Sequence, residues 1–355
     1  MLSQFIHRMQ LPREVIVGKG SLELIGSIFR SLGFTKSALL VSGEITFEVS
    51  GKKIKEMLRG EGLKVWEHII ASNAPTINDV KMCEEKIRKL KPQVVLGVGG
   101  GTKIDIAKLS SANQGIPFIS IPTTASHDGL SSPFASIKGL EKPYSIMAQS
   151  PIAVIADTEI IERAPYRFIA SGCGDVIAKL TSVRDWKLAH ERKNEYYAQY
   201  TASMSLMSAQ HLIENSHLIR PASEEGLRVL LESLISCGIA MGIAGSSRPC
   251  SGSEHLFSHA LDLIAPKPAL HGEQCGIGTI MIAFLHGLDW KMIRDTLRRV
   301  GAPVTSEEIG IDPKYIVEAL VIAPKIRPER YTILHEKPLT HEEAFALAKE
   351  TGVIE

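Results

Sequence analysis

The chain has few cysteines and no close pair of them. Its 355 residues include five, Cys83, Cys173, Cys237, Cys250 and Cys275, and none stands in a CxxC arrangement. An odd number without paired spacing argues against a disulfide framework and is typical of a protein kept reduced in the cytoplasm. We interpret Cys173 and Cys275, which stand near other polar motifs, as small buried apolar side chains.

Long hydrophobic runs and an excess of one charge are also missing. The first residues, MLSQFIHRMQLPREV, lack the uninterrupted apolar core of a signal peptide. The most apolar later stretches are about a dozen residues long, too short to cross a bilayer. A formal net charge of +1 gives no general attraction to nucleic acid or to an anionic membrane. We therefore expect no nucleic-acid partner, no membrane insertion and a cytoplasmic location.

The chain is long enough for two domains, and its two parts differ in pattern. Through residue 157, short apolar strands alternate with amphipathic helices, which predicts a parallel sheet covered on both faces. Thr76 is the expected N-cap of one of these helices. A polar section, residues 123–145, reads as turns. Residues 158–355 carry long helical stretches and few strand signals, so this part is predicted to be all-helical.

A glycine triplet ends one apolar strand and begins the next helix. Gly99, Gly100 and Gly101 would let the backbone approach a diphosphate, which the free N–H groups and positive dipole end of the helix attract. The run is not GxGxxG, and the acidic residue expected about twenty positions later is missing. A simple tight turn is therefore the alternative, in which Asp105 could act as a cap or form a hydrogen bond within the loop.

A second polar loop, PTTASHDG at residues 122–129, follows the next apolar strand. Loops at the carboxyl ends of strands form the ligand crevice of open α/β sheets. Two such loops could hold two parts of one dinucleotide. Ordinary turn chemistry explains the Ser, Asp and Gly residues of this loop equally well.

Three histidines and an aspartate form the candidate metal site. His255 and His259 are four residues apart, so they share one face of a predicted helix, and His271 stands sixteen residues after His255. A third imidazole from a Gly-flanked loop could complete a metal site, with Asp175 of SGCGDVIAK as the carboxylate. The alternative is a solvated or core-satisfied histidine pair.

Together these segments resemble the superfamily of iron-containing alcohol dehydrogenases and dehydroquinate synthases. The motifs GGGTKIDIAK, PTTAS, GCGD, and HxxxH followed by HGE occur in the expected order over nearly the whole chain. The resemblance implies the dehydroquinate synthase-like fold, with an α/β dinucleotide-binding domain at 1–157 and an all-α metal- and substrate-binding domain at 158–355. SHDGLSSPFASI and SGSEHLFSHAL are most similar to members that reduce dihydroxyacetone phosphate with NADH or NADPH for archaeal-type phospholipid synthesis.

The resemblance also implies roles for individual residues. Asp175, His255 and His271 would bind the metal, expected to be Zn²⁺, although Fe²⁺ or Ni²⁺ would accept the same ligands. Asp128, Asp175 and His259 would contact the substrate, and His259 and Asp128 would be catalytic. A satisfied histidine and a turn-forming aspartate are the alternatives. The cofactor NAD(P)H would be bound by Gly99, Gly100, Gly101, Thr102, Lys103, Thr123, Thr124, Ser126 and Ser132.

Other functions stay open at this stage. A glycerol or polyol dehydrogenase would use the same scaffold, and a cyclase like dehydroquinate synthase would use the metal and NAD⁺ without net change in the nicotinamide. A metal-dependent sensor would need no open metal position. The sequence does not choose between NADH and NADPH, and it does not place the residues that bind the substrate phosphate. A homo-oligomer is the general expectation for such enzymes.

Overall fold

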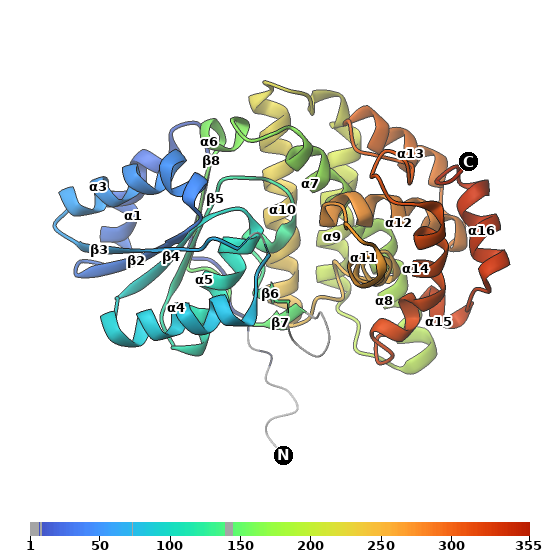
Figure 1. Ribbon diagram of the computed structural model, residues 1–355, viewed down its shortest axis with the longest axis horizontal. Coiled ribbons are helices and arrows are strands. Elements are labelled where there is room, and N and C mark those ends of the chain that lie inside the picture. The colour runs from blue at the N-terminus through green and yellow to red at the C-terminus, as the bar shows by residue number, and fades with distance from the viewer. Residues whose placement is uncertain (1–6, 8, 73, 139–144) are drawn as a thin grey trace, which may run out of the picture. The chain divides into compact units, whose positions relative to one another are not determined.

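The chain divides into two units, each with its own set of elements (Figure 1). The computed structural model describes residues 7, 9–72, 74–138 and 145–355. The first unit comprises Met1–Ala125, Gly129–Ala164 and Met241–Ser247, and the second comprises Ser126–Asp128, Pro165–Ala240 and Arg248–Glu355.

The first unit is built around a sheet of six strands in the order β1-β8-β5-β4-β2-β3. All five neighbouring pairs are parallel, as the sequence predicted. Parallel strands covered on both faces need apolar residues throughout, and β4, β5 and β8 are buried at every position. The strands are β1 (Glu14–Gly18), β2 (Ser37–Ser42), β3 (Lys64–Ile69), β4 (Val94–Gly99), β5 (Phe118–Pro122) and β8 (Ala153–Asp157).

The strand order reverses at β4. The chain passes from β2 outward to β3 at one edge, and it then returns to β4 on the other side of β2. Ser42 at the end of β2 donates a hydrogen bond through Oγ to the carbonyl oxygen of Val98 on β4, at 2.9 Å. In open α/β sheets, ligands bind beyond the carboxyl ends of the strands at such a switch point. The glycine triplet begins here, with Gly99 as the last residue of β4.

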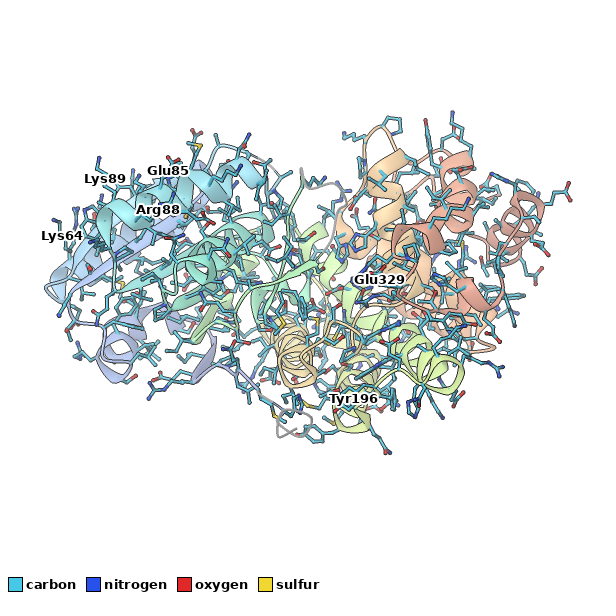
Figure 2. All side chains as sticks on the ribbon, turned by 90° about the horizontal axis from the view of Figure 1, so that it is seen from below. Lys64, Glu85, Arg88, Lys89, Tyr196 and Glu329 are labelled. Atoms are coloured by element: carbon cyan, nitrogen blue, oxygen red, sulfur yellow. The ribbon has the colours of Figure 1, made fainter. Side chains whose placement is uncertain are left out.

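Helices cover both faces of this sheet: α1 and α3 lie on one side, and α4 and α5 lie on the other (Figure 1). Amphipathic sequence explains this packing. On α4, Cys83 and Ile87 are buried, whereas Arg88 and Lys89 point outward (Figure 2). Thr76 caps α4, as predicted. The short and long helices of this unit are η2 (Ser21–Leu24), α1 (Ile25–Ser31), α2 (Glu44–Thr46), η3 (Phe47–Gly51), α3 (Lys52–Gly60), α4 (Ile77–Leu90), α5 (Gly101–Asn113) and α6 (Thr158–Glu162).

The polar section after β5, predicted as turns, contains two short strands. β6 (Phe134–Ser136) and β7 (Ser145–Met147) pair antiparallel. Three-residue strands carry too few residues for a period-2 pattern to stand out from turn residues. Residues 139–144 of this section lie outside the described residues.

The described elements of the second unit are helical, which confirms the predicted fold class. The long helical pattern of this part is not continuous, because α8 ends at Lys193 and its C-cap residue, Asn194, has a φ of 55° in the left-handed region. The helices are α7 (Arg167–Ile177), α8 (Lys179–Lys193), α9 (Gln199–Glu214), η5 (Ser216–Leu218), α10 (Glu224–Ala244, whose last turn from Met241 belongs to the first unit), α11 (Ser253–Ile264), α12 (His271–Leu285), α13 (Trp290–Arg299), α14 (Pro313–Ile326), α15 (Ile333–Glu336) and α16 (His341–Glu350).

One helix in the described part of the chain, α10, is long and apolar enough to cross a membrane by length and composition. Within the fold, 72% of its most apolar window is buried. A buried core helix meets the same length and composition test, so α10 is weak support for a membrane span.

Candidate metal centre and cofactor loops

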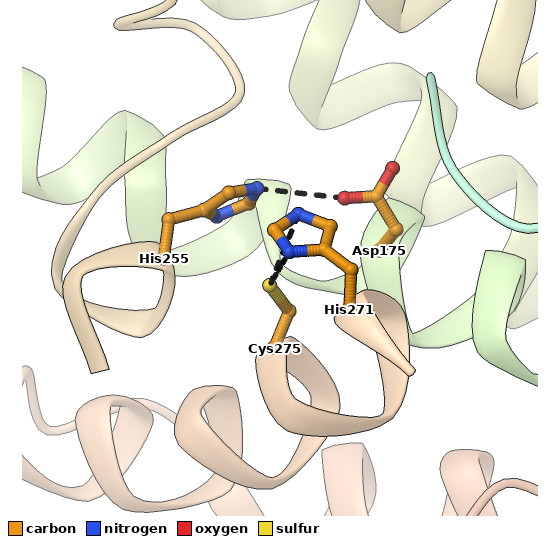
Figure 3. Close-up of side chains that lie close together, drawn as sticks. All are labelled: Asp175, His255, His271 and Cys275. Atoms are coloured by element: carbon orange, nitrogen blue, oxygen red, sulfur yellow. Dashed lines mark hydrogen bonds and ion pairs between the residues drawn. The ribbon is translucent and has the colours of Figure 1, made fainter. Parts of the chain in front are cut away.

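The three proposed metal ligands lie together within the second unit (Figure 3). Asp175 belongs to α7, His255 to α11, and His271 is the first residue of α12 rather than part of a loop. His255 Nε2 lies 3.5 Å from Asp175 Oδ1. One ligand atom of each of these residues, together with one of Cys275, lies within 4.8 Å of every other. Three helices thus supply one compact, buried donor set.

A second contact orients each imidazole ring. His255 Nδ1 lies 2.8 Å from Oε1 of the buried Glu254, and His271 Nδ1 lies 3.2 Å from Ser258 Oγ. These contacts leave the Nε2 atoms of both rings for the cluster. Metal-binding histidines usually have such a partner, which sets the tautomer and the ring orientation. Sequence reasoning missed Glu254 and Ser258, although each directly precedes a histidine of α11.

Glycines let α7 and α12 approach each other backbone to backbone. A Cβ at Gly174 would lie 2.2 Å from the carbonyl oxygen of Gly272, and a Cβ at Gly272 would lie 1.9 Å from the carbonyl oxygen of Ser171. No side chain fits at either position without a shift of the backbone. Because Asp175 follows Gly174 and His271 precedes Gly272, this close packing sets the separation of carboxylate and imidazole.

A buried lysine joins the two aspartates of the site. Lys179 Nζ lies 3.0 Å from Asp175 Oδ1 and 2.8 Å from Asp128 Oδ2, and the amide of Asp128 donates to Asp175 Oδ2 at 2.8 Å. Burial alone would raise the pKa of Asp175, but the charges of Lys179 and of two histidines hold this pKa well below its ordinary value. Burial and the charge of Asp175 raise the pKa of Asp128. Sequence reasoning missed Lys179, which stands one turn after Asp175.

His259 lies beside the donor set without being one of its four members. Its ring is stacked on that of His271, with centroids 6.0 Å apart, and the residue is buried. Burial lowers the pKa of His259 to about 3, and the charges of His255, Arg327 and Arg330 act in the same direction. A neutral imidazole donates one hydrogen bond and accepts one. The structure therefore gives different surroundings to the two histidines four residues apart: His255 belongs to the donor set, and His259 lies beside it.

The thiol of Cys275 completes the group of four. Its Sγ lies 3.6 Å from His271 Nε2 and also interacts with the imidazole of His255. The side chain is fully buried, and burial raises the pKa of the thiol. Its predicted burial is confirmed, but the interpretation as an apolar side chain missed its contact with two candidate ligands. The available signal was its position one turn after His271.

The donors fit the metal that the resemblance implies. One carboxylate and two imidazoles are a common ligand set for a catalytic transition metal. In a tetrahedral zinc site, nitrogen and oxygen ligands about 2.0–2.2 Å from the metal lie roughly 3.4 Å apart. The 3.5 Å between His255 Nε2 and Asp175 Oδ1 agrees with that separation.

Two of the predicted cofactor loops lie side by side within the first unit. Gly99 ends β4, Thr123 follows the neighbouring strand β5, and the amide of Thr123 donates to the carbonyl oxygen of Gly99 at 3.0 Å. A Cβ at Gly100 would lie 3.2 Å from Thr124 Oγ1. Because α5 begins at Gly101, its first free N–H groups lie at this edge, as binding of a diphosphate requires.

Thr102 and Lys103 lie in the first turn of α5. Lys103 Nζ donates to the carbonyl oxygen of Ser72, beyond the end of β3, and burial lowers the pKa of this lysine. Asp105 does not cap the glycine turn. Its carboxylate accepts instead from Lys108 Nζ at 3.1 Å and from the amide of residue 136 at 3.0 Å.

The last two predicted cofactor residues, Ser126 and Ser132, form hydrogen bonds with residues other than those of the glycine turn. Ser132 is buried in the first unit, and its Oγ accepts from the amide of Phe134 at 3.2 Å. Ser126 belongs to the second unit, where its carbonyl oxygen accepts from Ser171 Oγ at 3.3 Å. Their roles in cofactor binding stay predictions.

The chain is similar to known proteins over nearly its whole length. A sequence model described as iron-containing alcohol dehydrogenase matches residues 16–165. The glycerol-1-phosphate dehydrogenase (NAD(P)+) of Pyrococcus abyssi is 52% identical, over 98% of this chain and 100% of its own length. The protein of the same name from Methanothermobacter thermautotrophicus is 53% identical, over 98% of this chain and 99% of its own length.

Solved structures share the fold at lower identity. Glycerol dehydrogenase from Schizosaccharomyces pombe has a TM-score of 0.80 at 21% identity, covering 98% of this chain and 90% of its own. A probable glycerol dehydrogenase from Sinorhizobium meliloti 1021 has a TM-score of 0.79 at 19% identity, covering 99% of this chain and 100% of its own. At such identities the likeness concerns the fold alone, and it confirms the fold predicted from the sequence.

Proposed function

We propose that this chain, which belongs to the family of glycerol-1-phosphate dehydrogenases within the iron-containing alcohol dehydrogenases, reduces dihydroxyacetone phosphate to sn-glycerol 1-phosphate. NADH or NADPH is the reductant, and the product enters archaeal-type phospholipid synthesis. The structural observation that carries this proposal is the buried donor set of Asp175, His255 and His271.

Zinc is the proposed metal of this donor set, and Fe²⁺ or Ni²⁺ would accept the same three ligands. When bound, it supplies Lewis-acid polarisation of the substrate's ketone group. The chain itself prepares the site, because Glu254 and Ser258 hold both imidazoles with Nε2 toward the cluster. An His271→Ala variant is expected to lose stoichiometric zinc, and a variant that kept it would contradict the ligand assignment.

His259 and Asp128 are the proposed catalytic and substrate-contacting groups. His259 is neutral and lies beside His271, so it is suited to orient the substrate by donating a hydrogen bond. It can relay a proton from water to the reduced carbonyl oxygen, because one ring nitrogen accepts a proton as the other gives one up. Asp128 is held in place by Lys179 and by its own amide on Asp175. Its carboxylate is suited to accept from a substrate hydroxyl, and Asp175 lies close enough to share this contact.

Arginines near His259 supply the charge that a phosphorylated substrate needs. The charges of Arg327 and Arg330 both lower the pKa of His259. Burial lowers the pKa of Arg330 itself to about 9, and the charges of Arg327 and Arg248 act in the same direction. Arg330 is 6% exposed, and its Nη1 donates to the carbonyl oxygen of Ser251 at 2.7 Å. Guanidinium groups bind phosphate with two parallel hydrogen bonds. We assign the substrate phosphate to this arginine group, whose individual members the sequence could not place.

Nicotinamide oxidation tests this function directly. The purified protein is mixed with NADH or NADPH and with either dihydroxyacetone phosphate or unphosphorylated dihydroxyacetone. We expect kcat/KM to favour the phosphorylated ketone by roughly 10³-fold or more, because a substrate without the phosphate leaves buried polar groups of the site unpaired. Equal turnover of both ketones would favour the polyol dehydrogenase, and so would equal turnover of glycerol and glycerol 1-phosphate in the reverse, oxidising reaction. Substrate consumption without a change in nicotinamide absorbance would favour a cyclase.

A matched pair of variants tests the phosphate assignment. Arg327→Met removes a guanidinium of the arginine group, whereas Lys325→Met removes an exposed charge two residues away on the last turn of α14. We expect Arg327→Met to lower kcat/KM for dihydroxyacetone phosphate about 100-fold, the scale of a hydrogen bond to a charged group, and to leave turnover of dihydroxyacetone unchanged. Equal effects of both variants would contradict the assignment.

The remaining proposals concern cofactor, compartment and assembly. Residues 1–157 bind NAD(P)H through the paired loops at Gly99–Lys103 and Thr123–Thr124. Five free, buried cysteines support a reducing compartment, and we propose the cytoplasm. A homo-oligomer is proposed on general grounds.

A further inference from the structure

We propose that Asp185 is a positioning residue, which fixes the separation between the metal-binding helix α11 and the segment that carries Arg330. Its buried carboxylate bonds to the start of α11 and to the start of α15 at once. Through this separation it makes the site specific for a ketone that carries a phosphate group. The inference rests on the proposed function, in which His255 binds the metal and Arg330 belongs to the arginine group that binds the phosphate.

Three donors from separate parts of the second unit meet at Asp185, which lies on α8. Oδ2 accepts from the amide of Ser253 at 2.7 Å, and Oδ1 accepts from the amide of Ile333 at 2.7 Å. His286 Nε2, just after the end of α12, lies 3.0 Å from Oδ1. The side chain of Asp185 is fully buried, and a carboxylate removed from water needs such donors. One point on α8 therefore holds three segments.

The carboxylate of Asp185 takes the place of two missing helix caps. Ser253 is the first residue of α11 and Ile333 the first of α15, and neither N-cap residue, Gly252 or Thr332, caps its helix through a side chain. The first amides of a helix lack a partner within the helix and need one from outside. Because a single carboxylate supplies both partners, it ties the two helix starts to each other.

The chain before α11 lies directly against α8. A Cβ at Gly252 would lie 2.7 Å from Asp185 Oδ2 and 2.8 Å from Ser182 Cα. Ser182 Oγ also donates to the carbonyl oxygen of Pro249 at 3.0 Å. The first turn of α11, which carries His255, is thus fixed on α8, and Asp185 is the group of α8 that reaches from there to Ile333.

The segments on either side of Asp185 also exchange hydrogen bonds. Arg248 Nη1 donates to the carbonyl oxygen of Tyr331 at 2.9 Å, and Arg330 Nη1 donates to the carbonyl oxygen of Ser251 at 2.7 Å. The two segments therefore move as one while Ile333, three residues after Arg330, stays bonded to Asp185. The carboxylate sets where Arg330 lies relative to the metal-binding helix.

This separation affects only a substrate that is held at both ends. The binding energy of a phosphate speeds the reaction of a distant carbonyl group only when both groups reach their positions together. A ketone without the phosphate is held at its carbonyl end alone. Loosening the connection should therefore slow dihydroxyacetone phosphate much more than dihydroxyacetone.

Kinetics of the zinc-loaded full-length protein test the role of Asp185. An asparagine keeps one acceptor oxygen but turns an NH₂ group toward the other donors, so Asp185→Asn releases one helix start. We expect the ratio of kcat/KM for dihydroxyacetone phosphate to that for dihydroxyacetone to fall about 100-fold, the effect of a small misplacement. The Kd for Zn²⁺, measured by competition with a chromophoric chelator, should stay unchanged, because Glu254 still orients His255.

Asp157→Asn is the matched control. Asp157 is also a buried aspartate that accepts from backbone amides, those of Gly20 at 3.1 Å and Leu22 at 3.0 Å, but it belongs to the first unit. Both substitutions are expected to lower the free energy of unfolding, because each leaves a buried amide without its acceptor. Only Asp185→Asn should change the ratio of the two ketones.

A second pair of variants decides the matter if Asp185→Asn does not fold. His286→Leu leaves the carboxylate and both amides in place but removes the third donor, and we expect the ratio to fall about 10-fold, the scale of one hydrogen bond to a charged group. His286→Gln keeps a side-chain N–H that can reach Asp185 Oδ1, so it should keep the wild-type ratio. Equal ratios in these two variants overturn the inference.

Two other outcomes separate this inference from the proposed function. A folded Asp185→Asn protein that slows both ketones equally, or neither, overturns the positioning role and leaves the proposed function standing. Wild-type protein that turns over both ketones equally overturns the phosphate site, and the inference that rests on it falls as well.

Discussion

A single methyl group at Gly272 is expected to disrupt the metal centre. In Gly272→Ala, the new Cβ would lie 1.9 Å from the carbonyl oxygen and 2.6 Å from the carbonyl carbon of Ser171. Both atoms are backbone, so no side chain can turn away to relieve the overlap. An ordinary contact of 3.4 Å requires α12 and α7 to separate by about 1.5 Å (3.4 − 1.9) at this point.

This separation acts directly on the ligands. His271 stands one residue before Gly272 on α12, and Asp175 stands on the facing helix. We expect the free energy of unfolding to fall by at least about 1–3 kcal/mol, the usual cost of overpacking. Zinc affinity should fall by about 10- to 100-fold, the range seen when groups that orient ligands are disturbed.

Gly276→Ala is the control, because it adds the same methyl group one turn later on the same helix. Its Cβ would meet Gly174 Cα and Leu297 Cδ2 at 3.4 Å, which is ordinary contact. Thermal unfolding of the metal-free proteins and zinc competition with a chromophoric chelator give both quantities. The reasoning is refuted if Gly272→Ala matches Gly276→Ala in both measurements.

Three further predictions concern the metal, the buried lysine and the cofactor loop. Complete removal of metal by a chelator should abolish NAD(P)H oxidation, and added Zn²⁺ should restore it; full activity of metal-free protein would exclude a metal-centred reaction. Lys179→Met should lower the free energy of unfolding by about 3–5 kcal/mol, because Asp128 and Asp175 are left facing each other without their cation. Denaturant unfolding should show that adding Asp128→Asn to Lys179→Met recovers part of this loss. If the unfolding free-energy changes of the two substitutions simply add, the proposed coupling of Lys179 with the two aspartates is contradicted. Gly99→Ala should raise the Kd for NAD(P)H about 10-fold, since Gly99 has φ +154° and its Cβ would lie 2.9 Å from Lys103 Cγ; fluorescence titration measures this, and weakened zinc binding in the same variant would point to general misfolding instead.

Local patterns were sufficient for most of the fold. Buried strands such as Val94–Gly99 and amphipathic helices such as Ile77–Leu90 follow from the spacing of apolar residues, which burial on one or both faces imposes. The Thr76 cap follows from the local chemistry of helix ends. The strands Phe134–Ser136 and Ser145–Met147 were missed, because segments of three residues carry almost no periodic signal.

The metal-binding residues were predicted from residue spacing and family resemblance rather than from periodicity. The spacing of His255 and His259 suggested that both bind metal, with His271 and Asp175 as further candidate ligands. The family resemblance then removed His259 from that set. The structure brings Asp175, His255 and His271 together, which is consistent with that choice. His259 lies beside this set, next to charges that no local pattern connects with it.

The sequence by itself therefore determined the order of strands and helices, the glycine turn after β4 and the residue types available for a metal. Only the tertiary structure decided which of these residues meet. Lys179, Glu254 and Cys275 became visible through the packing of α7, α11 and α12, where glycines let backbones touch. The physical reason is that periodicity and capping act within one or two turns of chain, whereas a metal site depends on contacts between segments far apart in sequence.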